Sequence, residues 1–443
     1  MKLSFQNIGK VAKADIEIDA ITVITGENDT GKSTVGKLLY GIYTALNQLT
    51  PSNLLQSKYE SVFDDFDLLK RRIMNIEASE GELNEILILL SDPLLDFWGS
   101  YKDSDIERED KLDSLIKYSV KKVKSFLGDA GSLGVKPTGI EGILEDMLEK
   151  SDIKSSNVDT QRLLLENALL EEFSGSLTTE LILKPDASIH FVENKENFLK
   201  LTLRYNKIIK EGSHISKKRD FSQVFYIDNP FILDEFDRRS IFVSTERRKY
   251  NHTDSLTKLL SIREEKNFFE EAMLEKDISN ILSSVIKGNI KHSQSGYKYY
   301  EEGLSEPISI KNISTGMKSF ALLQLLMDYG HLNKRSEMLI LDEPEIHLHP
   351  DWQLKYAELI VLLAKEYQLR VLITSHSTDF VEAIDLYSQI HNINNGVRFY
   401  KTQPAPNGMS EIINVTDNLE PLYKDMVGPI YTFEKLEEEL NDR

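Results

Sequence analysis

Residues 21–34 read "ITVITGENDTGKST", an apolar, β-branched run that leads directly into a glycine-containing loop. The run at residues 21–25 is typical of a strand buried inside a parallel sheet. The loop satisfies the pattern G-x-x-x-x-G-K-[ST], and a helix is predicted after it. In this context, backbone N–H groups of the loop and of the helix start bind phosphate. The stretch therefore predicts an α/β protein with a mostly parallel sheet that binds a nucleotide.

The side chains of this loop have separate predicted tasks. Lys32 is expected to reach the β- and γ-phosphates, and the Ser33 hydroxyl is expected to be a ligand of Mg²⁺. Gly26 and Gly31 let the backbone approach the phosphates closely. The predicted nucleotide-binding set is Gly26, Glu27, Asn28, Asp29, Thr30, Gly31, Lys32, Ser33 and Thr34.

A second motif, "MLILDEPEIHLHP" at residues 338–350, puts two carboxylates at the end of an apolar strand. Successive strand residues point to opposite sides, so the two carboxylates are expected to have different tasks. We expect Asp342 to join the Mg²⁺ shell and Glu343 to act as the general base toward the attacking water. A surface turn before Pro344 would explain neither the apolar strand nor its coincidence with a phosphate loop.

Three histidines call for separate interpretations. His376, in "VLITSHS" at residues 371–377, follows another buried strand, where parallel sheets place groups that contact the ligand. We expect it to contact the γ-phosphate or the attacking water. His347 and His349 have no third ligand nearby, which favours a packing role over a metal site.

Composition limits the class of protein. The chain has 443 residues, enough for two to three domains, and a net charge of −19. It has no cysteine, which excludes disulfides and cysteine nucleophiles, and no apolar run of 18 residues. The start of the chain alternates like a strand and lacks the apolar core of a signal peptide. We therefore expect a soluble, cytoplasmic protein without a membrane partner.

Nucleic-acid binding stays open at this stage. The acidic balance argues against a globally basic binder of nucleic acid. Three local basic stretches could nevertheless contact DNA phosphates, although such stretches are more often solvated faces. They are "KYSVKKVK" at 117–124, "SKKRD" at 216–220 and "TERRKY" at 245–250.

Changes in the hydrophobic pattern divide the chain into four segments. Residues 1–48 and 222–443 carry the buried strands and the motifs, and are predicted to form one nucleotide-binding head. Residues 49–172 show long amphipathic helical patterns and are predicted to be a helical insertion arm. In residues 173–221 apolar residues recur at every second position, which predicts a β-rich segment that returns to the head. The tail offers two strands around "QPAPNG" and a charged final helix.

The motifs in this order resemble the ABC-type ATPase heads of the SMC, RecF and OLD families. The resemblance rests on Asn28 within the phosphate loop, on the D-E-P-E-x-H-L-H-P string and on the S-H-S histidine. It implies an ABC-type head with a mostly parallel sheet plus an antiparallel β layer, interrupted by the helical insertion. It also implies ATP and Mg²⁺ as the cofactors.

The same resemblance gives a meaning to "ISTGMKS", residues 313–319, which corresponds to the signature motif of such heads. Ser314 and Gly316 match the signature, and Thr315 departs from the usual glycine; the predicted signature set is Ser314, Thr315, Gly316 and Lys318. In these families the signature reaches the γ-phosphate held by a second protomer, which implies a homodimer or a higher homo-oligomer built from head dimers. An ordinary helix cap at Ser314 is an equally compatible interpretation of the residues themselves.

Three departures from the typical heads limit the resemblance. A Q-loop is not clear, because Gln223 precedes its strand instead of ending it, and Asp228 and Asn229 stand where a glutamine would be expected. The insertion is too short for an SMC coiled coil, and the tail carries no D-x-D cluster of an OLD-type nuclease. Compact heads of this size resemble the PARIS and Septu ATPases of bacterial anti-phage defence, which implies a separate effector protein, a nuclease or toxin. The alternative is a DNA-binding repair ATPase similar to RecF and SMC proteins.

Overall fold

A computed structural model of the chain describes residues 1–47, 62–63, 65–73, 105–131, 140–152, 158–181, 186–193, 196–216, 223–235, 251–261, 276–293 and 296–426. The chain divides into two compact units. The first unit contains Met1–Thr44 and Ala168–Arg443, and the second contains Ala45–Asn167. The four-segment division predicted from the sequence stays a prediction.

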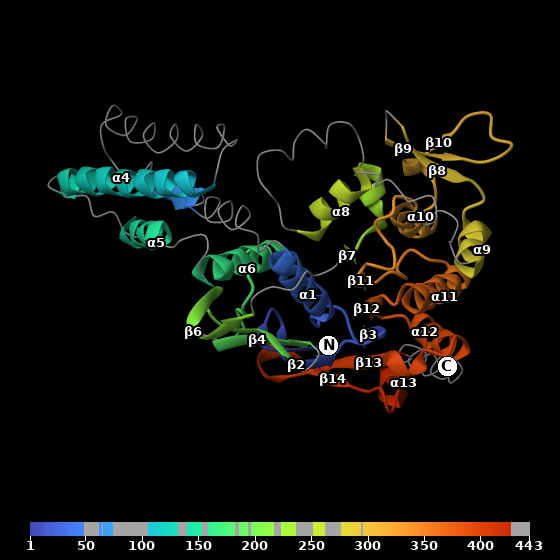
Figure 1. Cartoon of the computed structure of the whole chain (residues 1–443). Helices are drawn as coiled ribbons and strands as arrows, with labels where there is room; N and C mark the ends of the chain where they lie inside the picture. The colour runs from blue at the N-terminus through green and yellow to red at the C-terminus, as the bar shows by residue number, and fades with distance from the viewer. Residues whose placement is uncertain are drawn as a thin grey trace, which may run out of the picture. The chain divides into compact units, whose positions relative to one another are not determined.

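Five of the described strands run parallel in the first unit and carry the motifs (Figure 1). Their order in the sheet is β13-β3-β12-β11-β7. Their bounds are β3 Ile21–Thr25, β7 Val224–Ile227, β11 Met338–Asp342, β12 Arg370–Ser375 and β13 Val397–Pro404. Because these strands are parallel, their carboxyl ends meet at one edge, where such sheets bind ligands.

The rest of this sheet is mainly antiparallel and continues in the order β14-β2-β1-β4-β5-β6. The bounds are β1 Lys2–Ile8, β2 Val11–Glu17, β4 Asp186–Glu193, β5 Glu196–Arg204, β6 Lys207–Ile215 and β14 Ser410–Asn414. Arg370 of β12 lies 3.3 Å from Glu193 of β4, between Nη2 and Oε1, although β12 and β4 are six places apart in the sheet. A flat sheet would separate such strands by roughly 29 Å. The sheet is therefore strongly curved, and its antiparallel part folds back toward the parallel part.

Helices cover both faces of the parallel strands. On one face, α1 (Lys32–Asn47) packs so closely that a Cβ on Gly36 would lie 2.9 Å from Cγ2 of Ile340. On the other face, Leu339 and Leu341 join a large apolar core with α10, α11 and α12. The helices of the first unit after β7 are α8 His252–Ser261, α9 Lys276–Val285, α10 Thr315–Asp328, α11 Pro350–Tyr367, α12 Thr378–Ile390 and α13 Glu420–Met426.

Smaller elements complete the first unit. A three-stranded antiparallel sheet contains β8 Asn289–Ser293, β9 Gly296–Tyr300 and β10 Ile308–Ser309. Short 3-10 turns are η1 Pro230–Glu235, η3 Ile310–Asn312, η4 Asn394–Gly396 and η5 Pro406–Gly408. Of these turns, η1 and η3 lead from β7 and β10 toward the residues of the candidate site.

The described part of the second unit is helical. Its main helices are α4 Asp105–Gly131 and α5 Ile140–Asp152, and α6 Val158–Glu172 spans the boundary between the units in the sequence. Leu112, Ile116 and Val123 of α4 are buried against apolar residues of α5 and of residues 62–73. An ion pair between Lys150 and Asp65, 2.6 Å long, links two of these segments. The amphipathic pattern thus forms a separate small core.

The α/β fold predicted from the sequence is confirmed, and all the strands expected from apolar or alternating patterns are present. The sequence analysis missed β6 and the three-stranded sheet, because their patterns are short or strongly polar. In β6 only Ile208 and Ile215 are buried. A charged final helix was expected within the tail at about 395–443; α13 covers Glu420–Met426 there, and residues 427–443 lie outside the described residues.

Two further expectations, on membrane-spanning helices and on the basic stretches, can be compared with the described residues only. No described helix is long and apolar enough to span a membrane. Among the basic stretches, residues 117–124 lie on α4, where Lys117 pairs with Asp152 at 2.8 Å. Residues 217–220 and 245–250 lie outside the described residues, so their part in DNA binding stays a prediction.

We predict that Phe320→Ala will strongly destabilise the first unit. Phe320 is fully buried and packs edge-on against Trp352 and Tyr356. Truncation of a buried phenylalanine removes burial and leaves a cavity, at a cost of about 3–5 kcal/mol. Thermal and urea unfolding measure the effect. Leu386→Ala is the control: it is 51% exposed on α12, and a loss comparable to that of Phe320→Ala would contradict the assigned core.

Candidate functional site

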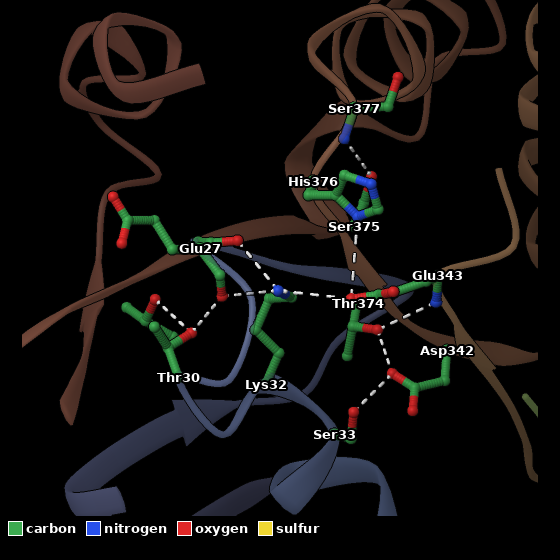
Figure 2. A network of polar contacts seen from close by, with 12 residues as sticks. Glu27, Thr30, Lys32, Ser33, Asp342, Glu343, Thr374, Ser375, His376 and Ser377 are labelled. Atoms are coloured by element: carbon green, nitrogen blue, oxygen red, sulfur yellow. Dashed lines mark hydrogen bonds and ion pairs between the residues drawn. The ribbon is translucent and has the colours of Figure 1, made fainter. Parts of the chain in front are cut away.

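The phosphate loop lies between β3 and α1, as predicted, and wraps around the Lys32 side chain (Figure 2). The Lys32 ammonium donates to the carbonyl oxygens of Gly26 and Glu27, each at 2.9 Å. Its side chain is only 4% exposed. The side chains of Glu27, Asn28 and Asp29 are exposed instead. The loop therefore holds one buried cation at the start of a helix whose first N–H groups have no partner within that helix.

The Asp342 carboxylate, at the end of β11, is the acceptor on which this edge of the sheet converges. Its Oδ1 accepts from the Ser33 hydroxyl at 3.0 Å and from the Thr374 hydroxyl at the end of β12. Its Oδ2 accepts from the Tyr226 hydroxyl of β7 at 3.0 Å. Burial and the nearby Asp342 charge raise the pKa of Tyr226 well above its ordinary value, which keeps the phenol protonated as a donor. The predicted metal ligands Ser33 and Asp342 are thus together, while Tyr226 and Thr374 were missed.

Glu343 turns away from Asp342 because its backbone is left-handed, with φ of 49°. The sequence analysis expected the separation to come from strand alternation, but β11 ends at Asp342. The Glu343 N–H donates to the carbonyl and the hydroxyl of Thr374, both at 3.1 Å, which holds this strained backbone. Its Oε1 lies 3.4 Å from the Lys32 ammonium and 3.8 Å from Nδ1 of His376. Glu343 therefore contacts the lysine of the phosphate loop, and His376 lies beside Glu343.

His376 is held by a carboxylate that the sequence analysis did not select. Glu345 Oε1 accepts from the His376 N–H at 3.0 Å and from the Ser375 hydroxyl at 2.7 Å. Glu345 is only 3% exposed, and its Oε2 is a buried oxygen without a hydrogen-bond partner in the described structure. The sequence did carry a clue, because Glu345 belongs to the same D-E-P-E string as Asp342 and Glu343. Glu345 joins the loops that follow β11 and β12.

A charged cluster occupies the place where a Q-loop was sought. Asp228 follows β7 and lies 3.0 Å from Nε2 of His252, whose Nδ1 lies 2.8 Å from Glu172. Burial alone would lower the pKa of His252, but the hydrogen bonds to Asp228 and Glu172 raise it to about 9. The protonated ring stacks on Tyr226 with centroids 4.2 Å apart. Asp228 thus binds a neighbouring cation, whereas Gln223 lies at the opposite end of β7 from the phosphate loop.

The signature-like knot, residues 313–319, opens α10. Ser314 is exposed and is the N-cap, because its hydroxyl accepts from the Met317 N–H at 3.3 Å. Thr315 is the first residue of the helix. Gly316 is buried, and a Cβ there would lie 2.9 Å from the Trp352 ring and 3.1 Å from the His347 carbonyl oxygen. The knot therefore packs directly on the segment that follows the β11 motif.

Lys318 differs from the other residues of the knot. It is 2% exposed, and its ammonium donates to Asp234 of η1 at 2.7 Å. The ammonium also lies 5.1 Å from the centre of the Phe231 ring. Lys318 therefore anchors the knot to η1 and does not present its charge at the surface. Phe231 in turn packs edge-on against His347, while His349 caps α11 with its ring nitrogen.

The donor set fits a nucleoside triphosphate with a divalent cation. Lys32 and the start of α1 offer positive potential to phosphate oxygens, and the Ser33 hydroxyl and Asp342 carboxylate are oxygen ligands of the kind that Mg²⁺ takes. Among the described residues no group of three or more histidine, aspartate or glutamate side chains could hold a metal by itself.

Comparisons with known proteins found similar solved structures and one matching family model. The chain is similar to an SMC head domain from Thermotoga maritima, with 14% identity, a TM-score of 0.36 and coverage of 94% of this chain and 98% of that chain. The chain is also similar to an Smc head domain with a coiled coil and joint from Pyrococcus yayanosii, with 13% identity, a TM-score of 0.35 and coverage of 96% of this chain and 98% of that chain.

No curated protein sequence matches the chain. A family model described as an AAA ATPase domain matches residues 1–381, which include the phosphate loop, the β11 carboxylates and His376. The chain belongs to this family of AAA ATPase domains.

Proposed function

We propose that this chain is a Mg²⁺-dependent ATPase whose heads dimerise on ATP and thereby regulate a separate effector protein in bacterial anti-phage defence. One observation carries the hydrolytic part: Lys32, Ser33, Asp342 and Glu343, from two distant parts of the sequence, meet at one edge of the sheet. Membership of an AAA ATPase family supports the same reaction.

Each residue has a task that its position supports. When bound, ATP supplies the anhydride bond, and Mg²⁺ neutralises charge on its phosphates. Lys32 binds phosphate oxygens, and Ser33 and Asp342 hold the metal. Glu343 takes the proton of the attacking water, and His376 orients that water or the terminal phosphate. The present ion pair between Lys32 and Glu343 keeps both groups in place, since each satisfies the other's charge.

The dimeric part of the proposal rests on the knot. Ser314 is exposed at the start of α10, where free N–H groups and the helix dipole favour an anion. Gly316 lets this end of the helix lie against the segment after β11. In the proposed dimer, Ser314, Thr315 and Gly316 complete the nucleotide site of the facing protomer, while Lys318 fixes the knot from inside. The same contacts between identical heads would suit a homodimer or a larger assembly of head dimers.

The regulatory part rests on the motif resemblance described above and on the compact helical insertion. The rival function is a DNA-binding repair ATPase similar to RecF and SMC proteins. The four lysines of residues 117–124 on α4 support contact with DNA, whereas the net charge of −19 opposes it.

We predict that Glu343→Gln will bind ATP and lose turnover. The amide keeps the shape of the side chain but cannot take a proton, so we expect a fall in kcat of about 100-fold or more. Phosphate release and nucleotide binding measure the two effects separately. Lys32→Ala should lose binding itself, and Glu382→Gln, on the exposed face of α12, is the matched control. Wild-type turnover in Glu343→Gln would refute the assigned base.

We predict that hydrolysis will reappear when two inactive variants, Lys32→Ala and Ser314→Arg, are mixed. Ser314→Arg should bind ATP normally but place a bulky side chain in the dimer interface. In a mixed dimer, one composite site carries both lesions and the other carries neither, so up to about half of the activity of that dimer should return. Phosphate release measures the recovery, and light scattering shows whether mixed dimers form.

The outcomes of this mixing experiment separate the alternatives. Recovery requires the knot to act on the nucleotide of the facing protomer. Mixed dimers without recovery would contradict action between protomers. If Ser314→Arg alone hydrolyses ATP normally, the knot does not take part in hydrolysis, and the Ser314 hydroxyl serves only as a helix cap.

We predict that the chain, expressed with the genes beside its own, will retain a nuclease or toxin on purification. The complex should differ between Glu343→Gln with ATP and the nucleotide-free wild type, because only the former keeps closed heads. Pull-down and size-exclusion chromatography measure this. Binding of duplex DNA is measured in parallel at two salt concentrations. Tight, ATP-dependent and salt-sensitive duplex binding without a protein partner would favour the repair ATPase instead.

A further inference from the structure

A hairpin near the end of the described chain touches the phosphate loop. It consists of β13 and β14, residues 397–414, and lies beyond residues 1–381 that the family model matches. Strand β13 pairs in parallel with β3, with Lys401 beside Thr25, the last residue before the loop. The hairpin is therefore placed directly under the loop that binds phosphate.

The first contact is made by Thr402 of β13, which is 5% exposed. Its Oγ1 lies 1.8 Å from the position that a Cβ would take on Gly26, so only glycine fits there. The Thr402 hydroxyl is hydrogen-bonded to the Thr30 hydroxyl at 2.9 Å. Thr30 in turn donates to the Glu27 carbonyl at 2.7 Å, which also accepts from Lys32 at 2.9 Å. A chain of hydrogen bonds thus runs from the hairpin to the phosphate-binding lysine.

The second contact is made by Ser410, the first residue of β14. Its N–H donates to the Lys10 carbonyl at 2.9 Å, and the register of β14 against β2 shifts directly after it. Its hydroxyl donates to the Thr30 carbonyl at 2.5 Å. A trans peptide is planar, so its C=O and the following N–H point in opposite directions. Ser410 therefore fixes the direction of the Gly31 N–H, which faces away from the hairpin.

We propose that Thr402 and Ser410 are positioning residues of the nucleotide site, which hold the phosphate loop in its binding conformation before the nucleotide arrives. The inference rests on the proposed function, since it concerns the affinity of the same loop for ATP. A preformed loop binds more tightly because ordering it costs nothing further on binding. The glycine at position 26 then serves the approach of the hairpin as well as that of the phosphates.

The hydroxyls of Thr402 and Ser410 indicate that the hairpin positions the loop in addition to packing against it. Thr402 and Ser410 are both buried, and each hydroxyl is directed at the single loop residue Thr30. If the hairpin only supported the sheet, side chains of the right volume would be enough at these positions, and valine or alanine would serve as well. The loop conformation, in contrast, depends on where the Thr30 hydroxyl and carbonyl point.

The test compares Thr402→Val and Ser410→Ala with wild type in binding of Mg²⁺ and the slowly hydrolysed analogue ATPγS, measured by calorimetry. Each variant removes one hydroxyl and keeps nearly the same volume. We expect binding weakened about 5- to 10-fold per hydroxyl, as for loss of one hydrogen bond. Amide hydrogen exchange of residues 26–34 without nucleotide should quicken by a similar factor. Thr402→Ser should bind as wild type does, and Gln403→Ala, next along β13, is the control.

The outcomes distinguish this inference from the proposed function. Wild-type affinity and unchanged loop exchange in both hydroxyl variants would overturn the inference and leave the ATPase standing. Absence of ATPγS binding by the wild type would overturn both. If Thr402→Val does not fold, Ser410→Ala decides alone, because it only deletes one oxygen. A drop in melting temperature without any change in affinity or loop exchange would assign these residues to sheet stability and refute positioning.

Discussion

The candidate site depends on one carboxylate, that of Asp342. It accepts hydrogen bonds from a helix start, from the neighbouring strand β12 and from the edge strand β7, through Ser33, Thr374 and Tyr226. These donors lie far apart in the sequence and meet only because parallel strands end at a common edge. A buried acceptor without partners would cost free energy, so the network fixes the relative heights of the strands as well as the carboxylate. The proposed metal ligand is thereby held in place by protein hydrogen bonds alone.

Around this carboxylate the chain separates tasks through backbone geometry. Asp342 and Glu343 are neighbours, yet the left-handed turn at Glu343 directs one carboxylate toward Ser33 and the other toward Lys32. Thr374 serves both, since its hydroxyl donates to Asp342 and its oxygens accept from the Glu343 N–H. Glu345 then holds the loop of His376. A backbone strain that would be costly elsewhere is here stabilised by several hydrogen bonds at once.

The sequence predicted the groups that carry charge and missed the groups that hold them. A lysine in a glycine-rich loop or an acidic pair after an apolar strand stands out because its local pattern is unusual. Tyr226 and Thr374 sit in strands where tyrosine and threonine are ordinary residues, and only the register of β7, β11 and β12 gives them a role. The curvature of the sheet was equally hidden, since the Arg370–Glu193 contact joins residues that no local pattern connects. Long-range register, which is set by the whole core, decides these features.

In the proposed dimer, the signature-like knot would bind a phosphate at the exposed end of α10 while its lysine stays buried inside the head. Lys318 pairs with Asp234 inside the head, so its charge is not presented at the exposed end of α10, where Ser314 is the N-cap. The field of such a helix end falls off within one turn, whereas a free lysine acts over about 8 Å at physiological salt. Two copies of a chain with a net charge of −19 repel one another. In the proposed dimer, short-range attraction at the knot would therefore favour closure when a phosphate lies in the facing loop, which would make ATP, and not general charge, the condition for dimerisation.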